Sequence, residues 1–295
     1  MIIIYSIAIS LLLGSDSSRT KYKSDFFKDL DLKLNYNPSE ILPKEPADKY
    51  ANFNKSKSTL YIDSIKNIAK NYIPTPPNSS DIIIMETNKG TMKLKYYPDI
   101  AEKHCYNFKK LANSGFYDNT LFHRVIKNFM IQGGDILSLD SNRDNDGLGN
   151  PGWTIDAEFN NLKHKKGVLS MARGSSINSA GSQFFICHKD APWLDGKYTV
   201  FGEVIDNIHI IDLIANAPTD YTSAISNCHN KIPEGENPKY WIKVQDPKTH
   251  RQLFSKIPIG KNGDNYRHEL IKNLRSDNPS YKIIIKSIRV VDAVN

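Results

Sequence analysis

The chain has 295 residues, of which 39% are hydrophobic and 24% are charged, and this composition predicts a globular protein with one substantial core and excludes a disordered chain. Its net charge of +7 comes from the two ends: basic and acidic residues number 11 and 8 in residues 1–80, 15 and 16 in 81–219, and 13 and 8 in 220–295. Three cysteines are too few and too scattered for a disulfide framework.

The chain opens with an apolar stretch of 12 residues, Ile2 to Leu13, followed by small and polar residues. This length fits the hydrophobic part of a secretory signal and falls short of the roughly 20 residues that a membrane-spanning helix needs. No basic residue precedes the stretch, so a membrane anchor or a merely apolar start are the alternatives. We interpret residues 1–18 as a signal-like segment, expect no stable membrane insertion, and expect a location in the secretory pathway or the endoplasmic reticulum lumen, otherwise in the cytoplasm.

Residues 19–80 are interpreted as an N-terminal extension that ends in a linker. Most of it is polar and interrupted by prolines, which indicates irregular chain. In "STLYIDSIKNIAKNYI" four side chains recur at helical spacing and predict one amphipathic helix: Tyr61, Ile65, Ile68 and Tyr72. The proline-rich "PTPPNSS" follows as the linker, so a domain begins near residue 81.

The pattern changes after this boundary. "DIIIMETNKGTMKLKYY" predicts two strands joined by a turn at Asn88-Lys89-Gly90. "PDIAEKHCYNFKKLANSG" predicts a helix, and "NIHIIDLIANA" predicts a second helix that buries Ile208 and Ile211. Short apolar segments predict further strands at 122–132, 167–172, 183–187 and 198–205. Short strands with two helices indicate a mainly β fold, a closed or nearly closed antiparallel barrel.

Residues 221–280 are polar and basic, and we interpret them as an insertion. "YWIKVQDPKTHRQLF" predicts a hairpin about Asp246-Pro247, and "DNYRHELIKNLRSDN" predicts a short basic helix. "YKIIIKSIRVVD" then alternates strongly enough to predict a last strand of the main sheet. The insertion has no recognisable RNA-binding motif and few interleaved aromatic residues, so we expect no nucleic-acid partner.

Two Cys-His dipeptides, Cys187-His188 and Cys228-His229, raise the question of a metal site. Neighbouring residues in a strand point to opposite faces, so the two side chains of one dipeptide cannot bind the same ion. We therefore expect no metal and no other cofactor.

The segment "FHRVIKNFMIQGGD" reads as a buried strand, yet it contains Arg124 and Gln132 and stops at a double glycine. A buried guanidinium is costly unless something accepts its hydrogen bonds. Arg124 therefore lies either on an exposed face or in front of a ligand.

Three blocks, "FHRVIKNFMIQGGD", "GVLSMARGSSINSAGSQFFIC" and "APWLDGKYTVFGEV", resemble the signature blocks of the cyclophilin-type peptidyl-prolyl isomerases, in the same order. The resemblance covers residues 81–219 and the last strand, and it does not explain residues 1–80 or 221–280. It implies a closed eight-stranded antiparallel barrel that is capped by two helices and receives X-Pro in a hydrophobic groove on its outside. Residues 81–295 would form this cyclophilin-like domain.

The resemblance also implies roles for the matching residues. Arg124 would be the catalytic arginine and His123 its neighbour at the substrate, while Gln132 and Gln183 would bind the substrate or orient Arg124. The proline pocket would be lined by Phe129, Met130, Phe185 and Leu194.

Further matches surround this pocket. Ala172 and the backbone of Arg173 would hold the peptide that precedes the proline, and Trp193 matches the tryptophan that contacts cyclosporin in drug-sensitive members. The sequence departs from the family in three ways: Arg173 replaces a common asparagine, Tyr198 replaces a histidine at the pocket rim, and the loop 136–150 is longer than usual. An aromatic residue at 198 still packs on proline, whereas the longer loop would reshape the neighbouring specificity pocket.

The implied reaction needs neither a nucleophile nor a metal. Rotation about X-Pro has a barrier of roughly 18–20 kcal/mol because the amide loses resonance as it twists. A guanidinium aimed at the lone pair of the twisted nitrogen binds the transition state better than the planar ground state. We predict a monomeric peptidyl-prolyl cis-trans isomerase that assists the folding of proline-containing polypeptides and is inhibited by cyclosporin. The alternative is a binding module or complex scaffold for proline-containing segments, with incidental isomerase activity.

Overall fold

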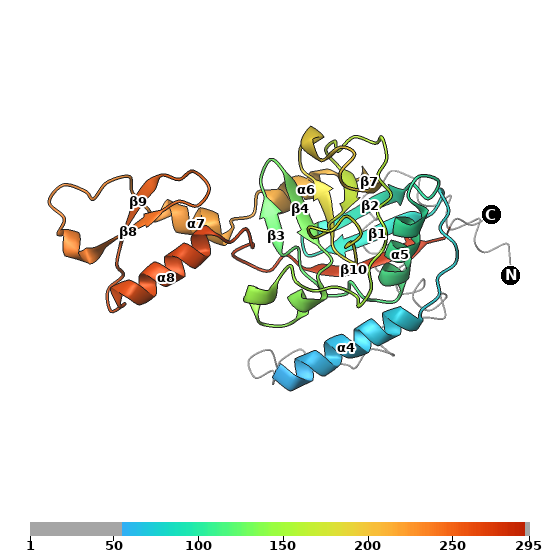
Figure 1. Ribbon diagram of the computed structural model, residues 1–295, viewed down its shortest axis with the longest axis horizontal. Coiled ribbons are helices and arrows are strands. Elements are labelled where there is room, and N and C mark those ends of the chain that lie inside the picture. The colour runs from blue at the N-terminus through green and yellow to red at the C-terminus, as the bar shows by residue number, and fades with distance from the viewer. Residues whose placement is uncertain (1–54, 293–295) are drawn as a thin grey trace, which may run out of the picture.

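A computed structural model describes residues 55–292 of the chain (Figure 1). The signal-like segment 1–18 and the irregular part of the extension up to residue 54 lie outside the described residues. Within 55–292, no helix combines the length and the apolar character that crossing a membrane requires.

Eight strands form one antiparallel sheet in the order β10-β1-β2-β7-β5-β6-β4-β3. Their bounds are β1 Ile82–Thr87, β2 Gly90–Tyr96, β3 Arg124–Ile126, β4 Met130–Gly133, β5 Val168–Met171, β6 Phe184–Cys187, β7 Val200–Asp206 and β10 Ile285–Val291. The predicted turn at Asn88-Lys89-Gly90 is confirmed, since β1 and β2 pair on either side of it. The segment predicted as one strand at 122–132 is instead the hairpin β3–β4, whose turn contains Asn128 with a positive φ of 64°.

The prediction that the barrel is closed is wrong, because the sheet curls but its end strands, β10 and β3, share no ladder. A single bridge between Leu121 and Ile284 joins the chain just before these two strands. Beyond it, irregular chain covers the edge of β3, since the Val125 N–H donates to the carbonyl of Asp277 at 2.9 Å. The Val125 N–H on this edge of β3 thus pairs with the end of the insertion and not with β10.

The core lies between the sheet and the two predicted helices, α5 (Glu102–Asn113) and α6 (His209–Ala215), which Figure 1 shows on different sides of the strands. The expected inner face of α5 is buried, with Phe108 at its centre in contact with the rings of Tyr117, Phe184 and Phe201. In α6 Ile211 is buried as predicted, but Ile208 is 41% exposed because it precedes the first helical turn and lies on its outer side.

The extension contributes one helix, α4 (Lys55–Asn71), which begins three residues before the predicted segment. Its most buried face consists of Ile62, Ile65 and Ala69, so the helix is rotated slightly from the predicted face, whose other members are only half-buried. In Figure 1, α4 lies beside the barrel on the side opposite the label of α6.

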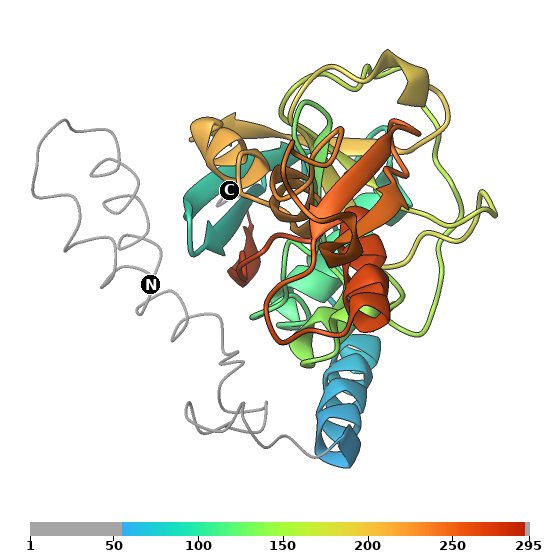
Figure 2. The same cartoon turned by 90° about the vertical axis from the view of Figure 1, so that its left-hand side faces the viewer.

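Residues 220–280 form a small folded unit that projects from the barrel next to β3 (Figure 1; Figure 2 views it from its own side). It contains α7 (Asp220–Ser226), β8 (Trp241–Gln245), β9 (Gln252–Lys256) and α8 (Gly263–Leu274). The predicted hairpin and basic helix are confirmed as β8–β9 and α8. An apolar cluster of its own holds the unit together: Ala224, Ile242, Val244, Leu253, Leu270 and Leu274.

Short 3-10 helices complete the structure at Ile136–Leu139, Arg143–Asn145, Pro192–Leu194 and Pro238–Tyr240. The first two shape the long loop 136–150, and the third carries Trp193.

Replacing residues 222–276 by a short Gly/Ser linker is expected to leave the barrel folded. The insertion begins and ends at one place, because Asp220 N–H donates to Asn278 O at 3.0 Å and Ser280 N–H donates to Pro218 O at 2.8 Å. Loop-closure entropy changes slowly with loop length, so a short linker costs little. Thermal unfolding followed by circular dichroism should remain a single cooperative transition, and a chain that fails to fold would show that the barrel depends on the insertion.

Candidate functional site

Arg124 lies on the outward-facing side of the hairpin β3–β4. It pairs across the hairpin with Gln132, which in turn lies opposite Phe185 of β6. Side chains at directly opposed positions share one face of a sheet, so these three residues form a row on the outside of the barrel. The Arg124 side chain is 44% exposed, which answers the question that its sequence raised: the guanidinium is not in the core.

A chain of side-chain hydrogen bonds orients this guanidinium. Arg124 Nη1 donates to Gln132 Oε1 at 3.3 Å, and Gln132 Nε2 donates to Gln183 Oε1 at 3.0 Å. Gln183 Nε2 donates to the carbonyls of Gly147 and Gly149 at 2.9 and 2.8 Å. The long loop 136–150 therefore holds Arg124 indirectly, through two glutamines.

The same loop also contacts the end of the insertion. Asn278 Nδ2 donates to Asp146 Oδ2 at 3.1 Å. Burial raises the pKa of Asp146 to about 7, and the nearby carboxylate of Asp135 adds to this shift. Asp146 therefore takes up a proton near neutral pH, at a position between the loop and the insertion.

An apolar cluster, separate from the barrel core, lies beside Arg124; we call it the outer apolar cluster. Strand side chains alternate between faces, and the residues between the core positions of β4, β5, β6 and β7 point to this outer side. Its buried members are Met130, Val168, Phe185, Cys187, Ala191, Leu194 and Val200, and its half-buried border includes Phe129, Ala172 and Tyr198. The structure thus brings together all four residues expected to line a proline pocket.

Aromatic rings form the border of this cluster. The rings of Phe129 and Trp193 lie 5.6 Å apart, and Phe185 meets Tyr198 edge to face at 5.9 Å. Trp193 is 55% exposed and stands above the cluster, free to contact a ligand.

Arg173 and Ala172 border the cluster on the side of Tyr198. The Arg173 guanidinium lies 4.7 Å from the centre of the Tyr198 ring and donates to the carbonyl of Lys197 at 3.1 Å. Ala172 N–H donates to Gln183 O at 2.9 Å. The Arg173 side chain therefore braces the rim, a contact that the sequence did not predict.

His188 fixes the turn that presents Phe129. The Asn128 N–H donates to His188 Nδ1 at 2.9 Å, and His188 N–H donates to Phe129 O at 2.8 Å. His188 Nε2 lies 3.0 Å from Asp212 Oδ1, so these partners assign the proton to Nε2. Burial lowers the pKa of His188, although Asp212 opposes the shift, and the neutral ring keeps Nδ1 available as an acceptor.

Behind Phe185, His164 stacks on the phenyl ring at 5.9 Å. His164 Nδ1 lies 3.0 Å from Asp195 Oδ1 and Nε2 lies 3.1 Å from Ser170 Oγ, an order reminiscent of a hydrolase triad. Ser170 is fully buried and donates to Thr199 O at 2.9 Å, so its hydroxyl cannot reach a substrate. These three residues therefore support Phe185, and Ser170 does not act as a nucleophile.

His123 lies on the opposite side of the hairpin from Arg124, so its burial does not favour the predicted contact with the substrate, which stays a prediction. Adjacent strand residues face opposite ways, and His123 is only 3% exposed. Burial lowers the pKa of His123, so the ring is neutral. It lies behind the face that carries Arg124, near Gly147 of the loop.

Asp277 is a site residue that the sequence did not reveal. Its Oδ2 lies 3.5 Å from Arg124 Nε, and its Oδ1 pairs with Lys248 Nζ at 2.5 Å. Asp277 is separated from Arg124 by the whole insertion, and no sequence pattern signals that the chain returns to this point.

Metal ligands do not gather at the site: within residues 55–292, no three His, Cys, Asp or Glu side chains lie together as a metal site requires. The side chains at the site therefore offer a charged donor beside an apolar surface, an arrangement that can bind a polar bond next to a ring.

Comparison with known proteins identifies a related family. The family model described as cyclophilin type peptidyl-prolyl cis-trans isomerase/CLD matches residues 82–232. The protein "Peptidyl-prolyl cis-trans isomerase-like 1" of Neurospora crassa is 44% identical over 145 residues, which are 47% of this chain and 83% of that protein. A peptidyl-prolyl cis-trans isomerase of Synechococcus elongatus is 45% identical over 124 residues, covering 42% of this chain and 80% of its own length.

Larger relatives match through the same domain. "Peptidyl-prolyl cis-trans isomerase-like 2" of Gibberella zeae is 45% identical over 139 residues, and the match spans 46% of this chain but only 23% of that protein. Among solved structures, a cyclophilin type peptidyl-prolyl cis-trans isomerase of Cryptosporidium parvum is similar with a TM-score of 0.50 and 28% identity, covering 72% of this chain and 99% of its own.

Proposed function

This chain belongs to the cyclophilin-type peptidyl-prolyl cis-trans isomerases and catalyses rotation about X-Pro bonds, and we propose that Arg124, beside the outer apolar cluster, stabilises the twisted amide. The observation that carries the proposal is the row Arg124, Gln132 and Phe185, which places a fixed charge next to an apolar surface.

The contacts of Arg124 suit this role. Gln132 holds Nη1 and Asp277 lies beside Nε, so Nη2 remains to donate to a substrate. As the amide twists, its nitrogen gains a localised lone pair, and a donor already in place stabilises that state without reorganising. Arginine suits the task because it stays charged at any physiological pH.

The outer apolar cluster would hold the proline ring. Phe129, Met130, Phe185 and Leu194 provide its walls, and Trp193 and Tyr198 provide its rim. An apolar surface excludes water from the amide and so strengthens the interaction with Arg124. Ala172 and the Arg173 backbone would hold the residue before the proline, while Gln183 acts on Arg124 through Gln132.

A protease-coupled assay on the purified full-length chain tests the function. The protease cleaves only the trans form of a short Ala-Pro peptide, so its slow phase reports isomerisation, which takes tens to hundreds of seconds uncatalysed. We expect the slow phase to accelerate in proportion to the enzyme concentration. A slow phase unaffected by the chain would contradict the assignment.

Asp277→Asn is expected to lower kcat/KM about 1.4- to fivefold, mainly through kcat, because Arg124 loses the carboxylate beside Nε and its guanidinium turns more freely. The range follows from the typical value of a partly exposed ion pair, about 0.2–1 kcal/mol. Asp277→Glu keeps the charge and should recover part of the loss. Lys248→Ala serves as the control, because it removes the other cation beside Asp277 and leaves the ion pair with Arg124 in place. Faster turnover in Asp277→Asn would mean that Asp277 restrains Arg124 and does not position it.

Cyclosporin is expected to inhibit the enzyme, and Trp193→Ala should weaken inhibition more than it weakens turnover. The exposed indole of Trp193 offers apolar area and an N–H donor to a ligand that reaches past the proline site. Inhibition constants of the two proteins compare the effect, with Tyr240→Ala as the control because Tyr240 is an equally exposed ring on the insertion. Equal inhibition of the Trp193 variant and the unaltered chain would remove Trp193 from the drug site.

We also propose that the enzyme acts as a monomer on polypeptides of the secretory pathway. The support for this location is the apolar stretch Ile2 to Leu13, which lies outside the described residues.

A further inference from the structure

A polar cleft opens where the insertion meets the barrel, and Arg124 is part of its wall. We call it the junction cleft. Its volume is about 400 Å³, and its lining comes from β3, the long loop and both ends of the insertion: Arg124, Arg143, Asp144, Asp220, Lys272, Asn273, Arg275, Ser276, Asp277 and Asn278. Since Arg124 also borders the proline site, a polypeptide bound at that site has a direct continuation into this cleft.

The charges of the junction cleft do not cancel. Asp144 pairs with Lys272 at 2.6 Å, and Asp220 pairs with Arg143 at 3.0 Å. The third carboxylate, Asp277, lies between Arg124 and Lys248.

Arg275 is the cation that this pairing leaves over. It is exposed and makes no ion pair with any residue that the structure describes. The cleft therefore has a net positive charge and offers one guanidinium to an incoming carboxylate.

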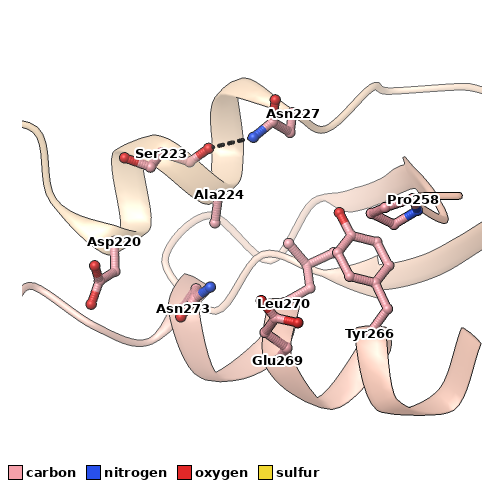
Figure 3. Close-up of a pocket in the computed structure, with 9 residues that line it drawn as sticks. All are labelled: Asp220, Ser223, Ala224, Asn227, Pro258, Tyr266, Glu269, Leu270 and Asn273. Carbon is pink, nitrogen blue, oxygen red and sulfur yellow. Dashed lines mark hydrogen bonds between the residues drawn. The ribbon is translucent and has the colours of Figure 1, made fainter. Parts of the chain in front are cut away.

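A second cleft continues the first across the insertion. Figure 3 shows it between α7 and α8, with a volume of about 290 Å³. It shares the lining residues Asp220 and Asn273 with the junction cleft, so the two clefts adjoin there, and we call the two together the path. Polar groups of Ser223, Asn227 and Tyr266 line this second cleft together with the apolar side chains of Ala224 and Leu270 (Figure 3). The carboxylate of Glu269 also lines it and is paired with Lys261.

We propose that this path binds the part of the substrate that flanks the proline, and that it selects polypeptides with an acidic side chain close to the proline. The inference rests on the proposed isomerase function and deepens it. The volume of the junction cleft is in the range of roughly 300–1,000 Å³ that is typical of ligand sites. Arg275 is the specificity-determining residue, because its guanidinium has no competing carboxylate.

A polypeptide fits these surroundings better than a nucleic acid. The junction cleft holds three carboxylates and leaves one guanidinium, that of Arg275, without a carboxylate partner among the described residues, so it suits a single carboxylate better than the row of phosphates in a nucleic acid. Amide, hydroxyl and guanidinium groups line the path, and such groups match the backbone and side chains of an extended peptide. The cleft also begins at the residue that acts on the X-Pro bond.

The test is a series of proline peptides in which one glutamate is moved from three residues before the proline to three residues after it, with lysine and alanine series beside it. For the unaltered chain we expect kcat/KM to be about three- to fivefold higher with glutamate than with lysine at one or two adjacent positions, and to approach equality at high salt. Arg275→Ala should bring the ratio close to one, and Arg275→Glu should reverse it.

Arg251→Ala is the matched control, because Arg251 is an exposed arginine of the insertion that lines neither cleft. It should keep both the turnover and the glutamate preference. A flat series with normal turnover of the alanine peptides would overturn the inference while leaving the isomerase function intact, whereas absence of turnover with every peptide would overturn both. If an RNA oligonucleotide competes with the peptides through Arg275 and the glutamate series is flat, the cleft belongs to a nucleic acid instead.

Discussion

Replacing Arg124 by alanine is expected to lower kcat/KM at least tenfold, which corresponds to about 1.4 kcal/mol of transition-state stabilisation. The variant keeps the outer apolar cluster and therefore still binds the proline ring, but it loses the donor that meets the twisted nitrogen. The loss should fall mainly on kcat, because the interaction strengthens only as the amide twists.

The fold should tolerate this change. The Arg124 side chain is partly exposed, and it contributes one hydrogen bond to Gln132 and one long ion pair to Asp277. Thermal unfolding should therefore shift little. Arg267→Ala is a suitable control, because Arg267 is an exposed arginine that donates to the carbonyl of Lys243 in the insertion. A folded Arg124→Ala variant with undiminished turnover would favour the alternative in which the groove only binds proline-containing segments.

The second large effect is expected for stability, at Lys109. Lys109 Nζ is buried within α5 and contacts Asp81 Oδ2 at 2.8 Å, Asp292 Oδ1 at 2.6 Å and the carbonyl of Pro76 at 3.3 Å. Tyr96 donates its hydroxyl to the same Asp81 oxygen at 2.6 Å, and burial raises the pKa of Tyr96. These contacts join the linker, the barrel and the end of β10.

Lys109→Ala is expected to lower the free energy of unfolding by about 3–5 kcal/mol, because it leaves the buried carboxylate of Asp81 without its cation. Chemical denaturation measures the loss. Lys110→Ala is the matched control: Lys110 is the next residue, its Nζ binds the carbonyl of Lys70 at the surface, and a change within about 0.5 kcal/mol is expected.

The double variant Lys109→Ala, Asp81→Asn separates this cause from a general loss of packing. Removing the charge of Asp81 should recover part of the stability that Lys109→Ala loses. If the double variant loses as much stability, relative to the unaltered chain, as the two single variants lose together, the carboxylate is not the reason.

Much of the fold follows from local pattern. The alternation in residues 82–96 predicts the β1–β2 hairpin, because one face of the strands is buried and the other is not. The helical spacing of Cys105, Phe108 and Leu111 predicts α5 in the same way, because one face of the helix is buried and its residues recur about every 3.6 positions. The strong alternation after the insertion likewise predicts β10, although the insertion of sixty residues precedes it in the sequence.

The core of the site also follows from the sequence, with the help of the family resemblance. Arg124 and Gln132 are eight residues apart around a short turn, and such a hairpin pairs them directly. Phe129 and Phe185 come from different segments, and the three motif blocks together indicated that they meet.

Tertiary structure decided the rest, because it depends on where distant segments come to lie. The insertion returns to β3, and this return places Asp277 beside Arg124. It also places irregular chain, and not β10, along the edge of β3. His123 is buried and Arg124 is not, because only one side of the hairpin faces solvent. A strand that is apolar on both faces does not reveal in its sequence which side that is. The clustering of Lys109 with Asp81 and Asp292 likewise requires three segments to converge, and no local period contains that information.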